Sequence, residues 1–262
     1  MTTLLLTGYA ALFLMMVGVW ILSVRLSNAA AVDVAWGAGF LLFGGLGAAF
    51  SDGAAERRFL LAGMIMLWSG RLALHLLKDR VLSGAPEDAR YQEIRARWKT
   101  HLNLKFFLFF QLQALLIALL SAPFLIVMGN PDPGISALEW TGAAIWLVAL
   151  AGESTADRQL ARFRSDPRNK GKVCRSGLWG YTRHPNYFFE WLTWIAYLVF
   201  ALPSPFGWTA AAGPVVLYVI LTRMTGIPLT EEHAVRSRGA AYREYQASTS
   251  AFIPWFRREA RT

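Results

Sequence analysis

The densest run of chemically capable side chains lies between residues 176 and 190. It reads Ser176-Gly-Leu-Trp-Gly-Tyr-Thr-Arg-His-Pro-Asn-Tyr-Phe-Phe-Glu190. Proline is favoured at the first position of a helix, where its missing N–H costs nothing, so Pro185 predicts a helix start. The free backbone N–H groups there, together with Arg183 and His184, predict an anion site suited to phosphate. Glu190, one turn into an apolar helix, favours a functional role over a simple interfacial anchor.

Two ionisable residues lie in apolar sequence in the first third of the chain. Asp33 and Arg71 each have apolar neighbours on both sides. A lone charge in lipid is costly, so both residues need a partner or water. Arg71, His75 and Asp79 follow at four-residue spacing, which would place them on one face of a helix. We interpret this face as a polar stripe that serves a ligand, with an interhelical ion-pair network as the alternative.

Two further clusters lie in the second half of the chain. Glu153, Asp157 and Arg164 fall close to one face of a predicted helix, and Glu153 lies near the apolar run. The C-terminal part contains Thr230-Glu-Glu-His233 and Tyr242-Arg-Glu-Tyr245, which alone are typical of an amphipathic surface segment. His233 has no second histidine at metal-ligand spacing, so we expect no metal site. Serine-hydrolase and P-loop signatures are absent from the sequence.

Apolar segments of membrane-spanning length must position these residues. The sequence is 55% hydrophobic and 16% charged, and its apolar runs reach the roughly 20 residues that cross a bilayer. Several runs contain closely spaced glycines, which suits tight helix packing in lipid. We expect an all-α polytopic membrane protein with seven transmembrane helices and a single domain over residues 1–262. The seven segments are Leu4 to Val24, Ala30 to Phe50, Phe59 to Leu77, Phe106 to Met128, Leu138 to Ala156, Tyr187 to Leu202 and Trp208 to Ile227.

Positive charge is unevenly distributed along the chain. The net charge is +9, and 22 of the 26 Lys and Arg residues lie in residues 78–105, 158–183 and 223–261. With seven helices these stretches share one side, which the positive-inside rule makes cytoplasmic. The N-terminus is then outside and the C-terminus cytoplasmic, so the charge reports topology rather than nucleic-acid binding.

Three further arginines and the cysteine have simpler expected roles. We expect the side chains of Arg25, Arg57 and Arg58 to extend to the membrane surface. The single cysteine, Cys174, excludes an internal disulfide.

The run Gly177-Leu-Trp-Gly-Tyr-Thr-Arg-His-Pro-Asn-Tyr-Phe-Phe-Glu190, with Tyr242-Arg-Glu-Tyr245 and Phe252-Ile-Pro254, resembles the membrane steroid 5-alpha-reductase family and its bacterial relatives. The expected helix count and the chain length fit that family. The Arg-His-Pro core and the Glu231-Glu232 pair are also similar to isoprenylcysteine carboxyl methyltransferases, which use S-adenosylmethionine. The continuation from Asn186 to Glu190 favours the reductases.

The resemblance implies an enzyme that binds NADPH from the cytoplasmic side. It would reduce a carbon–carbon double bond conjugated to a ketone in a steroid-like or other lipophilic substrate. Animal steroid reductases carry a Gln-Glu pair on helix two, where this chain offers Asp33 and Trp36, so the resemblance does not imply a steroid. The residues expected to bind the cofactor are Arg71, His75, Asp79, Arg80, Glu153, Asp157, Arg164, Tyr181, Arg183, His184, Asn186, Glu231, Glu232, Tyr242 and Tyr245.

Reduction of an enone needs an acid at the ketone oxygen and a proton for the alpha carbon. We expect Asp33, kept protonated by burial, to donate to the ketone, although a nearby Arg71 would favour its ionised form. Tyr187 or water would supply the second proton, and Glu190 would orient the nicotinamide end.

The alternatives are an S-adenosylmethionine-dependent methyltransferase and a non-enzymatic lipid-binding or transport protein. The expected location is the bacterial inner membrane. The expected partners are a lipophilic small molecule and membrane lipid, with no nucleic acid, and the sequence leaves the oligomeric state open.

Overall fold

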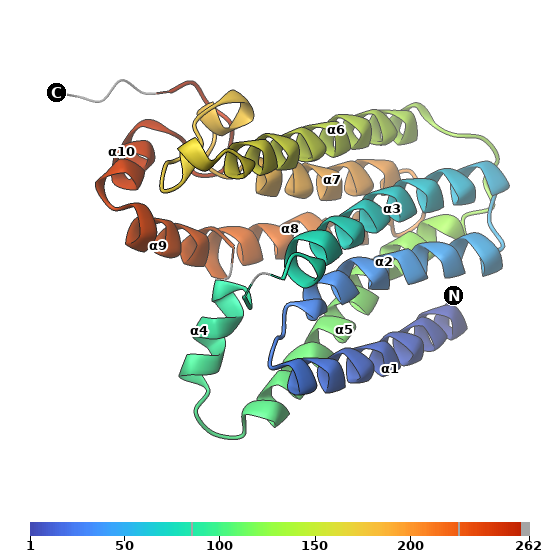
Figure 1. Ribbon diagram of the computed structural model, residues 1–262. Helices are drawn as coiled ribbons and strands as arrows, with labels where there is room; N and C mark the ends of the chain where they lie inside the picture. Colours follow the sequence, from blue (N-terminus) through green and yellow to red (C-terminus); the bar gives the residue numbers. More distant parts are fainter. Residues whose placement is uncertain (85, 225, 258–262) are drawn as a thin grey trace. The chain divides into compact units, whose positions relative to one another are not determined.

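The computed structural model describes residues 1–84, 86–224 and 226–257 (Figure 1). These residues form helices, with one isolated β-bridge between Thr182 and Ser250 and no strand, so the predicted all-α class is confirmed. The elements are α1 (Thr2–Leu26), α2 (Ala31–Phe50), α3 (Ala55–Leu76), the π-helical turn η1 (Leu77–Leu82), α4 (Ala89–Arg97), α5 (Leu102–Met128), α6 (Ala137–Ser165), the 3₁₀ turns η2 (Pro167–Asn169) and η3 (Gly177–Gly180), α7 (Pro185–Ala201), the 3₁₀ turn η4 (Gly207–Ala211), α8 (Ala212–Val219), the π-helical turn η5 (Ile220–Met224), α9 (Ile227–Arg238) and α10 (Ala240–Ser248).

Several helices have the length and composition of membrane spans. Within the described ranges five segments are long and apolar enough to cross a bilayer: Thr2–Leu26, Ala31–Phe50, Ala55–Leu82, Leu102–Met128 and Gly207–Arg238. They support a multi-pass membrane protein. The other two expected spans lie in α6 and α7, which are helical but are not among the five. The seven-span count and the orientation of the termini therefore stay predictions.

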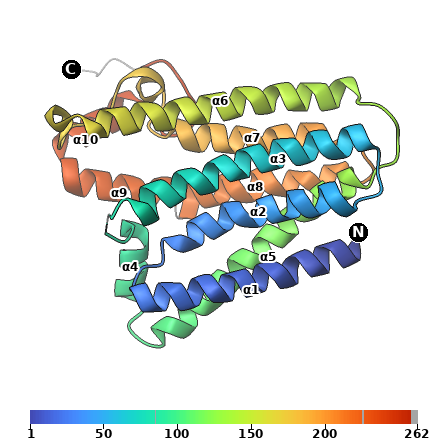
Figure 2. The ribbon, with the colours of Figure 1, turned by 45° about the vertical axis from the view of Figure 1, so that its right-hand side comes forward.

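The described helices divide into two compact units. The first unit contains Met1–Glu139 and Ala201–Ala210, and the second contains Trp140–Phe200 and the chain from Ala211 onward. In the first unit α2 contacts α1, α3 and α5 (Figures 1 and 2). A Cβ added at Gly37 of α2 would lie 3.1 Å from backbone atoms of Ser69 and Ala73 in α3. Small residues thus permit the close helix contact that the glycine-rich sequence predicts.

In the second unit α6 packs along α7 (Figure 2). A Cβ added at Gly142 of α6 would lie 2.6 Å from the backbone nitrogen of Phe200 in α7. Gly152, next to Glu153 of the predicted site, likewise faces the Phe189 ring of α7, so the two helices are also close beside the site residues. Between the two glycines, the Trp146 indole donates a hydrogen bond to the Tyr197 hydroxyl at 3.3 Å.

Arg57, near the start of α3, is the centre of a charged network in the first unit. Arg57 is only 4% exposed and forms an ion pair with the fully buried Glu139. The same guanidinium donates to the backbone oxygens of Asn130, Asp132 and Gly134. The connection from α5 to α6 therefore wraps around Arg57. The expectation that this side chain extends to the membrane surface is wrong, because its partners are supplied by a loop distant in sequence.

Replacing Arg57 with alanine should strongly destabilise the first unit. The substitution leaves the Glu139 carboxylate buried without its counter-charge, a loss that typically costs about 3–5 kcal/mol. Loss of helix content, followed by circular dichroism during SDS titration, measures this. The exposed Arg25, in the last turn of α1, provides a matched control whose replacement by alanine should change the unfolding free energy by about 0.5 kcal/mol or less. Equal losses in the two variants would contradict the assignment.

Candidate functional site

The turn before α7 is built by contacts to α6 and to the C-terminal segment. The backbone N–H of Leu178 donates to the Gln159 side chain at 2.9 Å, and the Trp179 indole donates to the Ala156 carbonyl at 3.0 Å. These bonds fix η3 on α6. The Thr182 hydroxyl accepts from the His184 backbone N–H at 3.3 Å, directly before Pro185. The predicted helix start at Pro185 is confirmed.

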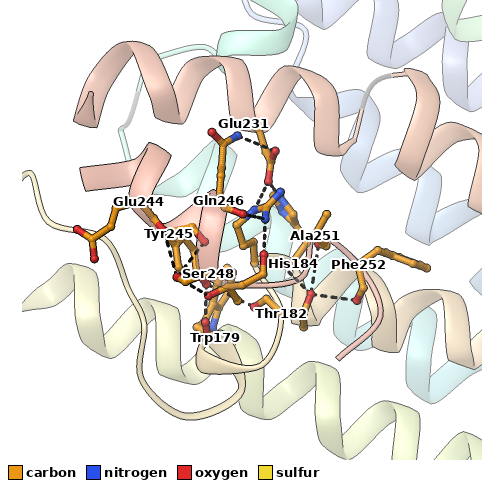
Figure 3. Close-up of polar contacts among 12 residues, drawn as sticks. Trp179, Thr182, His184, Glu231, Glu244, Tyr245, Gln246, Ser248, Ala251 and Phe252 are labelled. Atoms are coloured by element: carbon orange, nitrogen blue, oxygen red, sulfur yellow. Dashed lines mark hydrogen bonds and ion pairs between the residues drawn. The ribbon is translucent and has the colours of Figure 1, made fainter. Parts of the chain in front are cut away.

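Glu231 of α9 is the centre of a polar cluster in the second unit (Figure 3). Its Oε1 accepts a hydrogen bond from Arg183 Nε and lies 3.2 Å from His184 Nε2. Its Oε2 accepts from the Gln246 amide at 2.9 Å. One carboxylate thus joins the turn before α7 to α9 and α10. Three residues expected to bind the cofactor, Arg183, His184 and Glu231, are brought together here.

The Arg183 side chain is committed to protein partners. Besides Glu231, its Nη1 donates to the backbone oxygens of Gln246, at 3.1 Å, and Thr249. Its backbone N–H donates to the Ser250 carbonyl at 2.9 Å. The charge of the buried Arg183 guanidinium is balanced by the Glu231 carboxylate. The main role of Arg183 in the structure is therefore to hold the C-terminal segment in place.

His184 is held as a neutral ring. Burial lowers the pKa of His184 below its ordinary value, and this outweighs the hydrogen bond to Glu231 and its charge, which raise it. In the neutral form Nε2 carries the proton and donates to Glu231. The ring stacks on Tyr187, with 5.5 Å between centroids and 8° between planes. The Tyr187 hydroxyl lies 3.5 Å from the Thr230 hydroxyl.

The two tyrosines of α10 support this cluster. The Tyr245 hydroxyl donates to the Trp179 carbonyl, which ties α10 to η3. Burial raises the pKa of Tyr242 to about 12 and raises that of Tyr245 as well, so both hydroxyls stay protonated. Gln246 was missed by sequence reasoning. Its position four residues after Tyr242 would have placed it on the same helix face.

The remaining site residues of the second unit lie in varied environments. Glu153 is buried in α6, and Arg164 is exposed near the end of the same helix. Glu232 is exposed and pairs with Arg236 at 3.2 Å, so only Glu231 of the Glu-Glu pair joins the cluster. The half-buried members are Asp157 on α6 and Asn186 and Glu190 on α7, while Tyr181 is exposed.

A pocket of about 620 Å³ adjoins Arg183. Its lining mixes polar groups with the apolar side chains of the C-terminal segment. The lining residues are Arg183, Gln246, Ala247, Thr249, Ser250, Ala251, Ile253, Trp255 and Phe256.

In the first unit Asp33 belongs to an ion-pair network. Its carboxylate pairs with Arg80, accepts from Arg90 at 2.8 Å and accepts from the Tyr91 hydroxyl at 2.6 Å. Asp88 completes the network through contacts with both arginines, at 3.4 and 2.9 Å. A carboxylate surrounded by two guanidinium groups and a phenol acts as an acceptor. This geometry argues against the acid role expected for Asp33.

The residues of the expected polar stripe do not all lie on one regular α-helix. Arg71 and His75 lie on α3, but Asp79 and Arg80 lie in η1, whose π-helical geometry shifts the following side chains around the axis. Arg80 consequently meets Asp33 at the start of α2. Four-residue spacing assumes a regular α-helix and therefore misplaces the residues after Leu76.

Acid should destabilise the second unit through His184. The unfolded ring has a pKa near 6.5. Because folding lowers that pKa, the unfolded state binds the extra proton as pH falls below about 6.5, and stability drops by up to about 1.4 kcal/mol per pH unit. We expect the melting temperature to fall between about pH 7.5 and pH 5. Cys174 is the only cysteine and is buried in this unit, so a thiol-reactive dye reports its unfolding.

The variant His184→Gln should lose most of this pH dependence, because glutamine does not titrate. The exposed His233 offers the control, and His233→Gln should behave as the parent protein does. A parent-like pH profile in His184→Gln would show that another group is responsible.

Comparisons with known proteins give a family without a described function. A family model described as a protein of unknown function, DUF1295, matches residues 19–249. A relative from Schizosaccharomyces pombe, described as an uncharacterized protein, is 27% identical over 269 residues, covering 90% of this chain and 75% of the relative. This relative does not bear on the expected bacterial inner membrane. No solved structure matches the chain. Because the family model matches most of the chain, the protein belongs to the DUF1295 family of proteins of unknown function.

Proposed function

We propose that the protein is an NADPH-dependent membrane reductase of a carbon–carbon double bond conjugated to a ketone in a lipophilic substrate. The observation that carries the proposal is the Glu231 carboxylate, which gathers Arg183, His184 and Gln246. The Arg-His-Pro turn and the C-terminal Tyr-Arg-Glu-Tyr run are the residues that resemble the reductases. In the second unit they fold as one hydrogen-bonded cluster rather than as separate surface segments.

The charges of the second unit suit a phosphate-bearing cofactor. Arg158, Arg162 and Arg164 are exposed on the last turns of α6. Exposed guanidinium groups form strong bidentate contacts with phosphate. We assign the phosphates to Arg164 and its neighbours, because Arg183 already balances Glu231. In this proposal Asn186 and Glu190 of α7 orient the nicotinamide end.

When bound, NADPH would supply the hydride that adds to the beta carbon of the enone. Negative charge then develops on the ketone oxygen, and the alpha carbon must receive a proton. Tyr187 is our candidate for the proton donor. Its ring is held against the neutral His184, and its hydroxyl lies beside Thr230. Asp33 stays in its ion-pair network and takes no part.

NADPH should stabilise the detergent-solubilised protein, and S-adenosylmethionine should not. A ligand at 100 times its dissociation constant adds about 2.7 kcal/mol, which a thermal shift detects readily. Arg164→Ala should weaken NADPH binding about tenfold or more, since a charge-assisted hydrogen bond contributes about 1.5–3 kcal/mol.

Arg168 serves as the matched control for Arg164. It is an arginine four residues away whose side chain is 87% exposed and already paired with Asp166 at 2.7 Å. Arg168→Ala should bind NADPH nearly as the parent does. Stabilisation by S-adenosylmethionine alone would replace the reductase proposal with the methyltransferase alternative, and stabilisation by neither would favour a non-enzymatic lipid-binding protein.

The variant Tyr187→Phe should separate binding from chemistry. It removes the hydroxyl but keeps the ring stacked on His184, so NADPH stabilisation should persist. NADPH oxidation in the presence of a 3-oxo-4-ene steroid or a simpler lipophilic enone should fall about 100-fold or more, the usual cost of losing a general acid. Thr230→Val, which removes only the neighbouring hydroxyl, should have a smaller effect. Full turnover by Tyr187→Phe would exclude the proton-donor role.

A further inference from the structure

We propose that the C-terminal segment Ile253–Phe256, together with Tyr181, is an interfacial anchor that inserts its aromatic side chains into the headgroup boundary of the bilayer. We name these residues the aromatic anchor. This lipid-contacting surface is independent of whether the protein is a reductase.

The chain leading to the aromatic anchor is fixed to the helices. The Phe252 ring packs on Trp191 of α7 and Tyr218 of α8, each at 5.7 Å between centroids. The Phe252 carbonyl also accepts from the Thr182 hydroxyl at 3.0 Å. Tyr218 belongs to the segment Gly207–Arg238, which is long and apolar enough to cross a membrane. The anchor therefore starts from the side of a candidate membrane span.

A backbone hydrogen bond holds the aromatic anchor near the start of α7. The Trp255 backbone N–H donates to the Tyr181 carbonyl at 2.9 Å. Tyr181 is four residues before Pro185, the first residue of α7. Four residues of extended chain reach at most about 14 Å, so the anchor lies close to the end of this apolar helix. The Phe256 ring packs against Tyr181 and Trp255, each at 6.3 Å between centroids.

The anchor leaves large apolar side chains uncovered. Trp255 is 63% exposed and Phe256 is 76% exposed, while Ile253 and Tyr181 are also exposed. Because the chain is attached to the helices at Phe252 and at Trp255, it has little freedom to move these rings out of the solvent. Tryptophan and tyrosine gather at membrane–water interfaces, where the ring body meets the acyl boundary and the polar atom stays hydrated.

Charge around the anchor fits a lipid surface. Arg175 and Arg257 share the single carboxylate of Glu244, at 2.8 and 4.0 Å, which leaves one net positive charge. Basic residues beside exposed aromatic rings are attracted to anionic headgroups. A second copy of the chain would instead bring like charges together.

A fluorescent label can test the depth of the anchor, because the chain has one native cysteine. In a Cys174→Ala background, Trp255→Cys carries an NBD label in nanodiscs of phosphatidylcholine and phosphatidylglycerol. We expect blue-shifted emission and strong quenching by lipids with a nitroxide near the headgroup, and weaker quenching by a nitroxide deep in the acyl chain. Phe256→Cys gives a second reading if the tryptophan variant fails to fold.

Arg243→Cys is the matched control, because Arg243 is exposed on α10 and lies outside the anchor. Its label should emit as in water and resist both quenchers. Water-like emission and absent quenching at both residue 255 and residue 256 would overturn the proposal. Disulfide-linked dimers of the unlabelled Trp255→Cys variant, together with absent quenching of the labelled protein, would likewise overturn it and assign the surface to a second copy.

Discussion

Partial burial of the Glu231 carboxylate, whose side chain is 14% exposed, is the constraint on which the second unit depends. Removing a carboxylate from water is costly, and the cost is offset only when its oxygens are fully used. Here Arg183 supplies the opposite charge, while His184 and Gln246 fill the remaining acceptor positions. The turn before α7, helix α9 and helix α10 must therefore be in place together. Helices α9 and α10 have 12 and 9 residues, and isolated helices of this length are marginal in water.

This constraint determines how the side chains of the Arg-His-Pro turn and of α10 are used. Arg183 spends its donors on Glu231 and on backbone oxygens of the C-terminal segment, and Tyr245 donates to the Trp179 carbonyl. Side chains used in this way shape the fold of the C-terminal part and leave little for a ligand. The charged side chains that stay exposed in this unit, such as Arg164, are not used in this way.

In the first unit, ion pairs lie near both ends of α2. At the start of α2, Asp33 pairs with Arg80 and Arg90, while beyond its end Arg57 pairs with Glu139. In a multi-pass protein the apolar faces contact lipid as readily as each other, so packing alone specifies helix position weakly. Buried ion pairs require accurate geometry, because a misplaced partner leaves an unpaired buried charge, which has a high free-energy cost. They can fix helix register where apolar contacts do not.

The sequence alone determined the helical class, the membrane-spanning segments in outline and the start of α7 at Pro185, because these follow from local composition and backbone chemistry. It also identified Arg183, His184 and Glu231 as special, since unusual residue types stand out in apolar surroundings. It could not assign their partners. The tertiary structure decided that Arg57 is buried, that Asp33 accepts from Arg90 and Tyr91, and that Gln246 joins Glu231. Each of these outcomes depends on residues far apart in the chain, and a single π-helical turn after Leu76 is enough to change which face of a helix a side chain occupies.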